Sequence, residues 1–212
     1  MRLIGMLDSP FVRRVAIALD LLGVTFTHEA VSVFSHFERF RSINPVVKAP
    51  TFICDDGTVL MDSSLILQFV EAALSSGHSL WTGEQIQLQH EYRAVSLALV
   101  ACEKSAQAVY ETNLRPASKQ YDPWLQRVRG QLQDAYAALE QEIQQRPKLF
   151  AGAPNHASLF AAVAWQFSTS LLADLLPTAK HPALAALSQR LEQHPSFMKF
   201  PPVGPGVQAP PV

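Results

Sequence analysis

The chain has 212 residues and a mass of 23.4 kDa, and 17 lysines and arginines against 18 aspartates and glutamates give a net charge of -1. This balance argues against a nucleic-acid-binding protein or a polybasic membrane patch, because both need a basic face. Two cysteines exclude a disulfide scaffold and a four-thiolate zinc site. The apolar stretches are too short for a membrane-spanning helix, and Asp8 and Pro10 interrupt any signal-peptide core. We therefore expect a cytoplasmic globular protein.

The N-terminal segment predicts a βαβ unit. Arg2–Met6 is a short apolar run, typical of a buried strand. Ser9 and Pro10 provide a helix cap and a favoured first residue, and apolar spacing predicts a helix from Phe11 to Leu22. Thr25–Val31 alternates and contains β-branched residues, which indicates a second strand parallel to the first.

The next segment predicts a helix, a hairpin and another helix. A polar helix is expected over Ser35–Ser42, followed by a loop with two prolines. Thr51–Cys54 and Val59–Met61 are short strands joined by a turn that contains Asp56-Gly57, a strong hairpin signal. A helix capped by Asp62-Ser63-Ser64 then extends to about Ala73. The first part of the chain therefore follows the order βαβ-α-ββα.

The remainder of the chain predicts only helices and a tail. The expected helices cover residues 84–112, 123–145, 157–175 and 182–193. The proline-rich segment 201–212 has no apolar period and is expected to lack regular structure. We expect the fold class α/β plus all-α, with domains over residues 1–78 and 84–200.

Three motifs in the N-terminal domain carry a family resemblance. They are Ser9-Pro10-Phe11-Val12-Arg13, Asn44-Pro45-x-x-Lys48-x-Pro50 and Asp62-Ser63. In this order and at these spacings, the chain resembles the glutathione S-transferase superfamily up to about residue 200. The resemblance implies a thioredoxin-like N-terminal domain that binds glutathione, packed on an all-helical C-terminal bundle.

Ser9 is the candidate catalytic residue. It lies where a strand turns into a helix, and the free N–H groups and positive end of a helix favour an anion. A hydroxyl group there can donate a hydrogen bond to a thiol sulfur and favour the thiolate. The resemblance to serine-type members assigns Ser9 this role toward glutathione. The alternative is that Ser9 only caps the helix before Pro10.

The other two motifs indicate binding of the glutathione backbone. By resemblance, the Ala49-Pro50 bond is cis, and the backbone of Ala49 pairs with the cysteinyl unit of glutathione. Ser63 is expected to cap the helix that follows, whose N–H groups suit the γ-glutamyl carboxylate. Asp62 is expected to meet the γ-glutamyl ammonium. The alternative for Asp62-Ser63 is a plain helix cap.

Four further residues are assigned by a looser resemblance. His36 is placed where some relatives bind the glycyl carboxylate. The alternative is that His36 is only a surface residue without a role in binding. Lys48 either approaches glutathione or is a solvated loop lysine. Phe11 belongs to the expected glutathione-binding set, whereas Arg13 is expected to be structural, joining domains by a bidentate ion pair.

Other positions bear on stability, on redox chemistry or on the second substrate. Relatives begin a central helix with a Ser/Thr-x-x-Asp box, and Ser158 in place of the aspartate is expected to weaken it. The loop Leu7–Arg13 holds no cysteine, and Cys54 and Cys102 are expected to be buried apolar residues. Four aromatic residues of the helical domain either belong to the core or line an electrophile pocket: Tyr92, Tyr110, Trp165 and Phe167.

The resemblance implies a glutathione transferase, which activates the thiol of glutathione for attack on a small apolar electrophile. Glutathione is then the cosubstrate, no metal is required, and a homodimer is expected. Two alternatives stay open: a binding protein that kept the fold without the chemistry, and a glutathione-dependent disulfide reductase or isomerase. Neither a nucleic acid nor a membrane is an expected partner.

Overall fold

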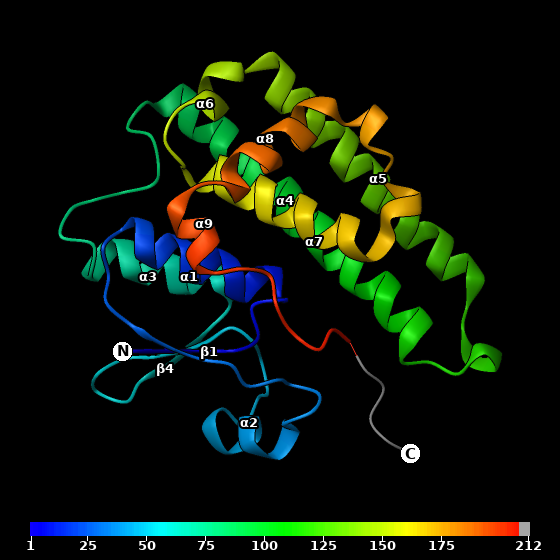
Figure 1. Ribbon diagram of the computed structural model, residues 1–212, viewed down its shortest axis with the longest axis horizontal. Coiled ribbons are helices and arrows are strands. Elements are labelled where there is room, and N and C mark those ends of the chain that lie inside the picture. Colours follow the sequence, from blue (N-terminus) through cyan, green and yellow to red (C-terminus); the bar gives the residue numbers. More distant parts are fainter. Residues whose placement is uncertain (208–212) are drawn as a thin grey trace. The chain divides into compact units, whose positions relative to one another are not determined.

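The chain divides into two compact units in a computed structural model, which describes residues 1–207 (Figure 1). One unit comprises Met1–Leu80 and the residues from Pro195 onward, and the other comprises Trp81–His194. The first unit contains a four-stranded sheet with helices, and the second is helical. The predicted fold class is therefore confirmed. Within residues 1–207, no helix combines the length and the hydrophobicity that crossing a bilayer requires.

The sheet of the first unit has the strand order β2-β1-β3-β4. Its strands are β1 (Arg2–Ile4), β2 (Thr27–Glu29), β3 (Thr51–Ile53) and β4 (Val59–Met61). β1 and β2 are parallel, as the βαβ order predicts, whereas β3 is antiparallel to both β1 and β4. β1 ends before the predicted Met6 because Gly5, with φ of 142°, turns the chain out of the strand.

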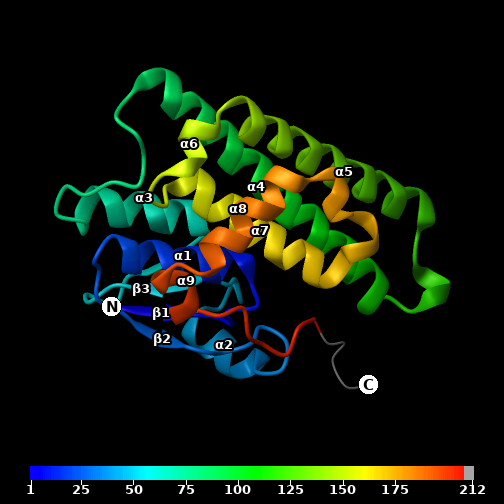
Figure 2. The ribbon, with the colours of Figure 1, turned by 45° about the horizontal axis from the view of Figure 1, so that its top comes forward.

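Helices cover both faces of this sheet. Figure 2 shows α1 (Pro10–Leu21) and α3 (Ser63–Ala73) on one side of the strands and α2 (Phe37–Ile43) on the other. On the α2 side, Ile4, Val31 and Phe40 form a fully buried cluster. This cluster packs α2 against the end of β1 and the segment that follows β2.

The C-terminal helix α9 (Pro195–Lys199) belongs to the first unit, although the sequence grouped residues 84–200 as one helical domain. The physical reason is Arg13 of α1, which is 1% exposed. Its Nε donates to the carbonyl oxygen of Phe200 across 2.8 Å, and its guanidinium lies 5.6 Å from the centre of the Phe197 ring. Arg13 thus joins α1 to α9 within the first unit through carbonyl oxygens and a ring, whereas an ion pair between domains was expected.

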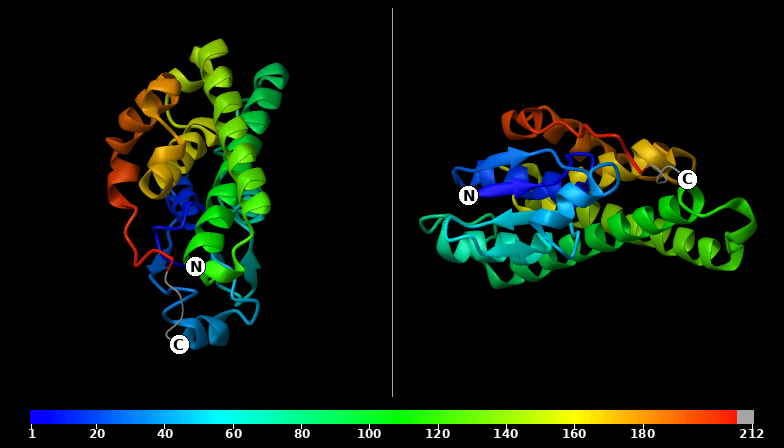
Figure 3. Two further views of the ribbon diagram at one scale, coloured as in Figure 1. Left: turned by 90° about the vertical axis from the view of Figure 1, so that its right-hand side faces the viewer. Right: turned by 90° about the horizontal axis from the view of Figure 1, so that it is seen from below.

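The second unit is a bundle built on two long helices, α4 (Gln85–Asn113) and α5 (Asp122–Gln145), which run side by side (Figure 3). Three further α-helices complete it: α6 (Pro147–Ala151), α7 (His156–Leu172) and α8 (Pro182–Glu192). Short 3-10 turns lie at Ala117–Lys119, Ala173–Leu175 and Thr178–Lys180. α7 is the buried centre of the bundle, since all residues from His156 to Trp165 are buried.

The cap of α7 corrects one expectation from the sequence. Asn155 Oδ1 accepts from the backbone N–H of Ser158 across 2.8 Å, and Ser158 Oγ accepts from the backbone N–H of Asn155 across 3.0 Å. The serine that replaces the expected aspartate therefore closes a complete capping box. A hydroxyl oxygen suffices because the box needs only an acceptor at this position.

The tail was expected to lack regular structure, and residues 201–207 contain no helix or strand. Residues 208–212 of that tail lie outside the described part of the chain.

Candidate functional site

The strand register brings parts of the three sequence motifs to one edge of the sheet. Ile4 pairs with Thr51, and Thr51 pairs with Met61, so the residues just beyond these pairs are neighbours: Gly5, Pro50 and Asp62. An added Cβ at Gly5 would lie 2.6 Å from a methyl group of Val12 and 3.4 Å from Cβ of Ala49. The end of β1, the start of α1 and the loop before β3 are therefore packed together.

Ser9 lies at the start of α1, where the sequence placed it. Its Oγ accepts a long hydrogen bond of 3.5 Å from the backbone N–H of Val12, and the residue is half-buried. Because Oγ is the acceptor in this cap, the hydroxyl hydrogen remains available to donate. The cap and a hydrogen bond to a sulfur atom are thus compatible roles for one hydroxyl group.

The loop before β3 is held rigidly by a buried asparagine. Asn44, 1% exposed, donates from Nδ2 to Thr51 Oγ1 across 2.8 Å, and Thr51 Oγ1 donates to the carbonyl oxygen of Lys48 across 2.6 Å. The Ala49–Pro50 peptide bond is cis, which confirms the expectation. The sequence motif contained Asn44, but its partner Thr51 was not recognised as a positioning residue.

Asp62, and not Ser63, caps α3, so the predicted role of Ser63 as the cap is wrong. Asp62 Oδ1 accepts from the backbone N–H groups of Ser64 at 2.9 Å and of Leu65 at 3.3 Å. Asp62 also adopts φ of 69°, a left-handed conformation that costs free energy for a residue other than glycine. Ser63 is the first residue of the helix and is buried.

A buried cation lies at the same helix terminus and was missed by the sequence reasoning. Arg14 of α1 is 2% exposed, and its Nη1 donates to Ser63 Oγ at 3.4 Å and to Ser64 Oγ at 3.3 Å. Its position in α1 gives no signal of this role, because its partners are 49 and 50 residues away. The start of α3 therefore combines helix N–H groups, two hydroxyl groups, a guanidinium and the Asp62 carboxylate.

The remaining candidates are less closely tied to this edge. His36 is the exposed residue before α2, and its Nδ1 lies 3.3 Å from Ser35 Oγ. Lys48 is exposed in the loop before Pro50, and Phe11 is half-buried in the first turn of α1. Lys48 directly precedes Ala49 and Phe11 lies two residues after Ser9, whereas His36 contacts Ser32 and Ser35 of the segment after β2.

The two cysteines are both thiols, and they differ in burial. Cys102 is buried, as expected, whereas Cys54, at the end of β3, is only half-buried. Desolvation, followed by the neighbouring carboxylates of Asp56 and Asp55, raises the pKa of the Cys54 thiol. A raised pKa lowers the thiolate fraction and makes Cys54 a poor nucleophile at neutral pH.

The aromatic residues named in the sequence divide into core and surface. Trp165 is 5% exposed and its ring meets that of Tyr136 edge-on at 5.3 Å, so it is a core residue. Tyr92 is exposed and stacks on Trp81 at 4.2 Å, and Tyr110 is also exposed. Phe167 is half-buried.

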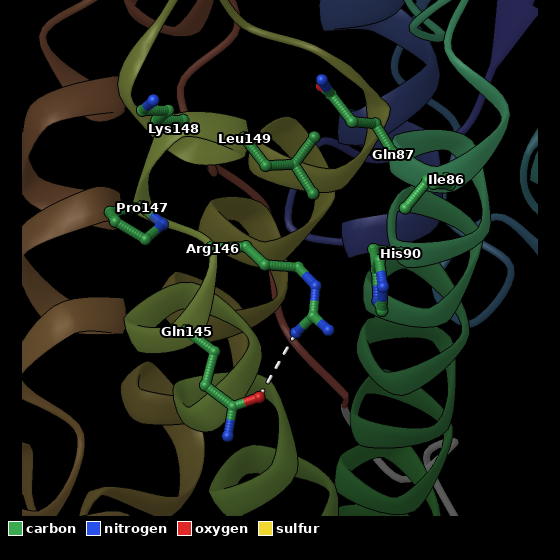
Figure 4. A pocket seen from close by; sticks show the side chains of 8 residues that line it. All are labelled: Ile86, Gln87, His90, Gln145, Arg146, Pro147, Lys148 and Leu149. Atoms are coloured by element: carbon green, nitrogen blue, oxygen red, sulfur yellow. Dashed lines mark hydrogen bonds between the residues drawn. The ribbon is translucent and has the colours of Figure 1, made fainter.

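A pocket in the helical unit is lined by Ile86, Gln87 and His90 of α4 and by residues 145–149 (Figure 4). The expected glutathione-binding residues are not among those that line it. Its arginine, Arg146, donates from Nη1 to Glu142 Oε2 at 3.1 Å, and Arg93 donates to the other oxygen of Glu142 at 2.6 Å. These ion pairs with a buried carboxylate give the cationic side chains a structural role.

Comparison with known proteins shows which family the chain is similar to. Residues 3–76 match the family model described as the N-terminal domain of glutathione S-transferase. The uncharacterised GST-like protein YibF of Escherichia coli K12 is 25% identical over 140 residues, which cover 66% of this chain and 68% of that protein. Glutathione S-transferase U3 of Arabidopsis thaliana is 32% identical over 92 residues, which cover 43% of this chain and 38% of that protein.

Solved structures extend the similarity over the whole chain. A glutathione transferase family member from Pseudomonas fluorescens Pf-5, with bound glutathione, is 26% identical with a TM-score of 0.80, covering 100% of this chain and 99% of that one. A glutathione S-transferase from Methylobacterium radiotolerans, in complex with glutathione sulfonate, has a TM-score of 0.85 at 24% identity, covering 100% and 99%. Together, the match of the N-terminal domain and the similarity over the whole chain support the glutathione S-transferase superfamily for this protein.

Proposed function

We propose that this protein is a glutathione transferase of the serine type. The observation that carries the proposal is the shared sheet edge, where the strand register aligns Gly5, Pro50 and Asp62 and Ser9 caps α1. The solved relatives with bound glutathione or glutathione sulfonate support the same ligand.

The residues at this edge fit the chemical groups of glutathione. The start of α3, with Ser63 and the Arg14 guanidinium behind it, suits the γ-glutamyl carboxylate. The Asp62 carboxylate suits the γ-glutamyl ammonium, since its second oxygen is not used in the helix cap. The backbone of Ala49 would pair with the cysteinyl unit, and His36 or Lys48 would meet the glycyl carboxylate.

The chemical role of Ser9 follows from its hydroxyl group. It would donate a hydrogen bond to the sulfur of glutathione and stabilise the thiolate, while the thiol proton passes to solvent. The thiolate would then attack the carbon of a small apolar electrophile, forming a carbon–sulfur bond as the leaving group departs with its electron pair. The proposal retains a homodimer and a cytoplasmic location, with glutathione as the cosubstrate.

A calorimetric titration with reduced glutathione tests the binding step. Saturation at micromolar to millimolar concentration is expected, and no binding at several millimolar would contradict the proposal. Transfer is then measured with 1-chloro-2,4-dinitrobenzene as the electrophile. Binding without turnover on this and other electrophiles would favour a binding protein on the same fold.

Ser9→Ala tests the catalytic step. Loss of a hydrogen bond to a charged sulfur should lower kcat/KM by about tenfold or more. The pKa of the bound thiol, followed by thiolate absorbance, should rise. Ser42→Ala, at an exposed serine of α2, is the matched control. Unchanged turnover in Ser9→Ala would remove Ser9 from the mechanism.

Light scattering of the purified protein tests the homodimer.

A further inference from the structure

The C-terminal segment does not hang free from α9 but follows α1 (Figures 1 and 2). Lys199 pairs with Asp20 of α1 at 2.6 Å. The ring of Phe200 stacks on Phe26 with 5.7 Å between centroids, and its carbonyl oxygen accepts from Arg13. These contacts direct residues 201–207 toward the first turn of α1.

Two glycines of this segment, Gly204 and Gly206, contact the carboxylate of Asp8. The backbone N–H of Gly206 donates to Asp8 Oδ2 across 2.8 Å. A Cβ added at Gly204 would overlap the same carboxylate, and Gly206 has φ of 68°. The sequence Gly204-Pro205-Gly206 therefore needs its first glycine for close approach and its second for backbone conformation. Two glycines meeting one carboxylate indicate a specific contact.

Asp8 directly precedes Ser9, so this contact fastens the C-terminal segment one residue away from the proposed catalytic serine. We propose that residues 200–207 form a strap, fastened to Asp8, that limits the size of the group that can sit on the glutathione sulfur. Asp8, Gly204 and Gly206 are then specificity-determining residues. The inference rests on the proposed function, because the sulfur position comes from it.

The composition of the strap defines the class of substrate. Residues 200–207 contain no charged side chain, and Pro201, Pro202 and Pro205 limit the backbone freedom. The strap thus presents an apolar, stiff border to the sulfur. This border suits small apolar electrophiles and excludes long substituents, which would have to displace the strap and break its bond to Asp8.

Binding of S-substituted glutathiones measures the available space without any chemistry. The affinities of S-methylglutathione and S-hexylglutathione are compared by calorimetry for the full-length chain. Asp8→Ala removes the acceptor, and Gly204→Ala introduces the overlapping Cβ. Each should shift the affinity ratio toward the hexyl compound by about fivefold or more, the free energy of one or two methylene groups buried.

Matched variants define the controls. Asp8→Asn retains an acceptor oxygen for Gly206 and should keep the wild-type ratio. Gly83→Ala adds a Cβ in open space at a glycine without positive φ, and should also keep it. A ratio that is unchanged or falls in both Asp8→Ala and Gly204→Ala would overturn the proposal.

Amide hydrogen exchange at Gly206, measured by NMR, tests whether its N–H is hydrogen-bonded to Asp8. Protection is expected in the wild type and in Asp8→Asn, and loss of protection in Asp8→Ala. Exchange of Gly206 at the rate of an unfolded peptide in the wild type would overturn the strap. If the wild type binds neither S-substituted glutathione, the proposed function fails, and the exchange of Gly206 still decides whether the strap is fastened.

Discussion

Arg14 Nη1 donates to the Oγ of Ser63 across 3.4 Å and thereby links the centre of α1 to the first residue of α3. The arginine is 2% exposed, so its charge lies in a region of low dielectric constant, where its effect on a neighbouring anion is strong. This relationship makes Arg14 part of the proposed carboxylate subsite, although no sequence pattern selects it.

Replacing Arg14 should therefore weaken glutathione binding more than it weakens the fold. Arg14→Met keeps the length and the apolar contacts of the side chain and removes the charge. We expect the Kd for glutathione to rise about tenfold, the effect of one hydrogen bond to a charged group. The free energy of unfolding should also fall, because Arg14→Met takes this buried donor away from the Oγ atoms of Ser63 and Ser64, so affinity is measured at a temperature where the variant is folded.

Calorimetry and urea denaturation measure these two effects. Arg13→Met is the matched neighbour, because Arg13 is equally buried and contacts the carbonyl oxygens of Phe197 and Phe200. It should lower the melting temperature and spare glutathione affinity. Equal losses of affinity in the two variants would show that Arg14 acts only through the fold.

Asp62 combines a helix cap with a charge, and two substitutions separate these roles. Asp62→Asn keeps an acceptor for Ser64 and Leu65 and tolerates the left-handed conformation. It should preserve stability but raise the Kd for glutathione about fivefold, as expected for an exposed charge pair of about 1 kcal/mol. Asp62→Ala should lose the same affinity and, in addition, about 1 kcal/mol of stability from the missing cap.

A ligand variant sharpens this experiment. Glutathione that lacks its amino group should bind the wild type more weakly than glutathione does, because Asp62 then has no cation to meet. Asp62→Asn should bind the two ligands equally. If Asp62→Asn still discriminates between them, another residue recognises the ammonium.

The pKa of Asp8 predicts a pH dependence of stability. Desolvation raises this pKa above its ordinary 3.8, although hydrogen bonds from the backbone of Gly206, Ser9 and Asp8 itself act in the opposite direction. Above pH 3.8 the unfolded chain loses this proton before the folded protein does, so the free energy of unfolding falls as the pH rises through the folded pKa. Asp8→Asn should therefore gain stability relative to the wild type as the pH rises from below 3.8 toward neutral.

Asp56 provides a control of opposite sign. Its exposed carboxylate accepts from Thr58, first from the backbone N–H, and its pKa is lowered. The wild type should then lose stability relative to Asp56→Asn as the pH falls below 3.8. Urea denaturation followed by circular dichroism, at a series of pH values, gives both difference curves. If the stability differences of the two variants from the wild type changed with pH in the same direction, the raised pKa of Asp8 would be contradicted.

Local signals predicted most of the first unit. Ser9-Pro10 starts α1, Asp56-Gly57 closes the hairpin, and the order of elements gives the parallel and antiparallel pairing. Each of these features depends on residues a few positions apart. The family motifs then selected Ser9, Pro50 and Asp62, which the strand register places on adjacent loops or strands.

The parts that the sequence could not predict depend on partners far apart in the chain. Arg13 meets Phe200 across 187 residues, and Gly206 meets Asp8 across 198 residues. A single sequence contains no pattern that pairs such positions. The difference between the predicted cap of α3, Ser63, and the observed cap, Asp62, has another cause. Either residue type can cap a helix, and the left-handed φ of Asp62 decides between them.

The capping box of α7 gives a final prediction, on the stability of the helical unit. Ser158 Oγ satisfies the backbone N–H of Asn155, and Ser158 is 1% exposed, so Ser158→Ala leaves this donor without its side-chain acceptor. We expect a loss of about 1 kcal/mol. Asn155→Ala should cost more, about 2 kcal/mol, because Asn155 also donates from Nδ2 to the carbonyl oxygen of Leu149 across 2.8 Å.

Tryptophan fluorescence measures this effect selectively. All three tryptophans, Trp81, Trp124 and Trp165, belong to the helical unit, so urea denaturation followed by fluorescence reports on that unit. Ser170→Ala, at an exposed serine in the last turn of α7, is the control and should be nearly silent. If Ser158→Ala were equally silent, the box would be formed without stabilising the helix. A measured loss would show that Ser158 stabilises α7 through this capping box.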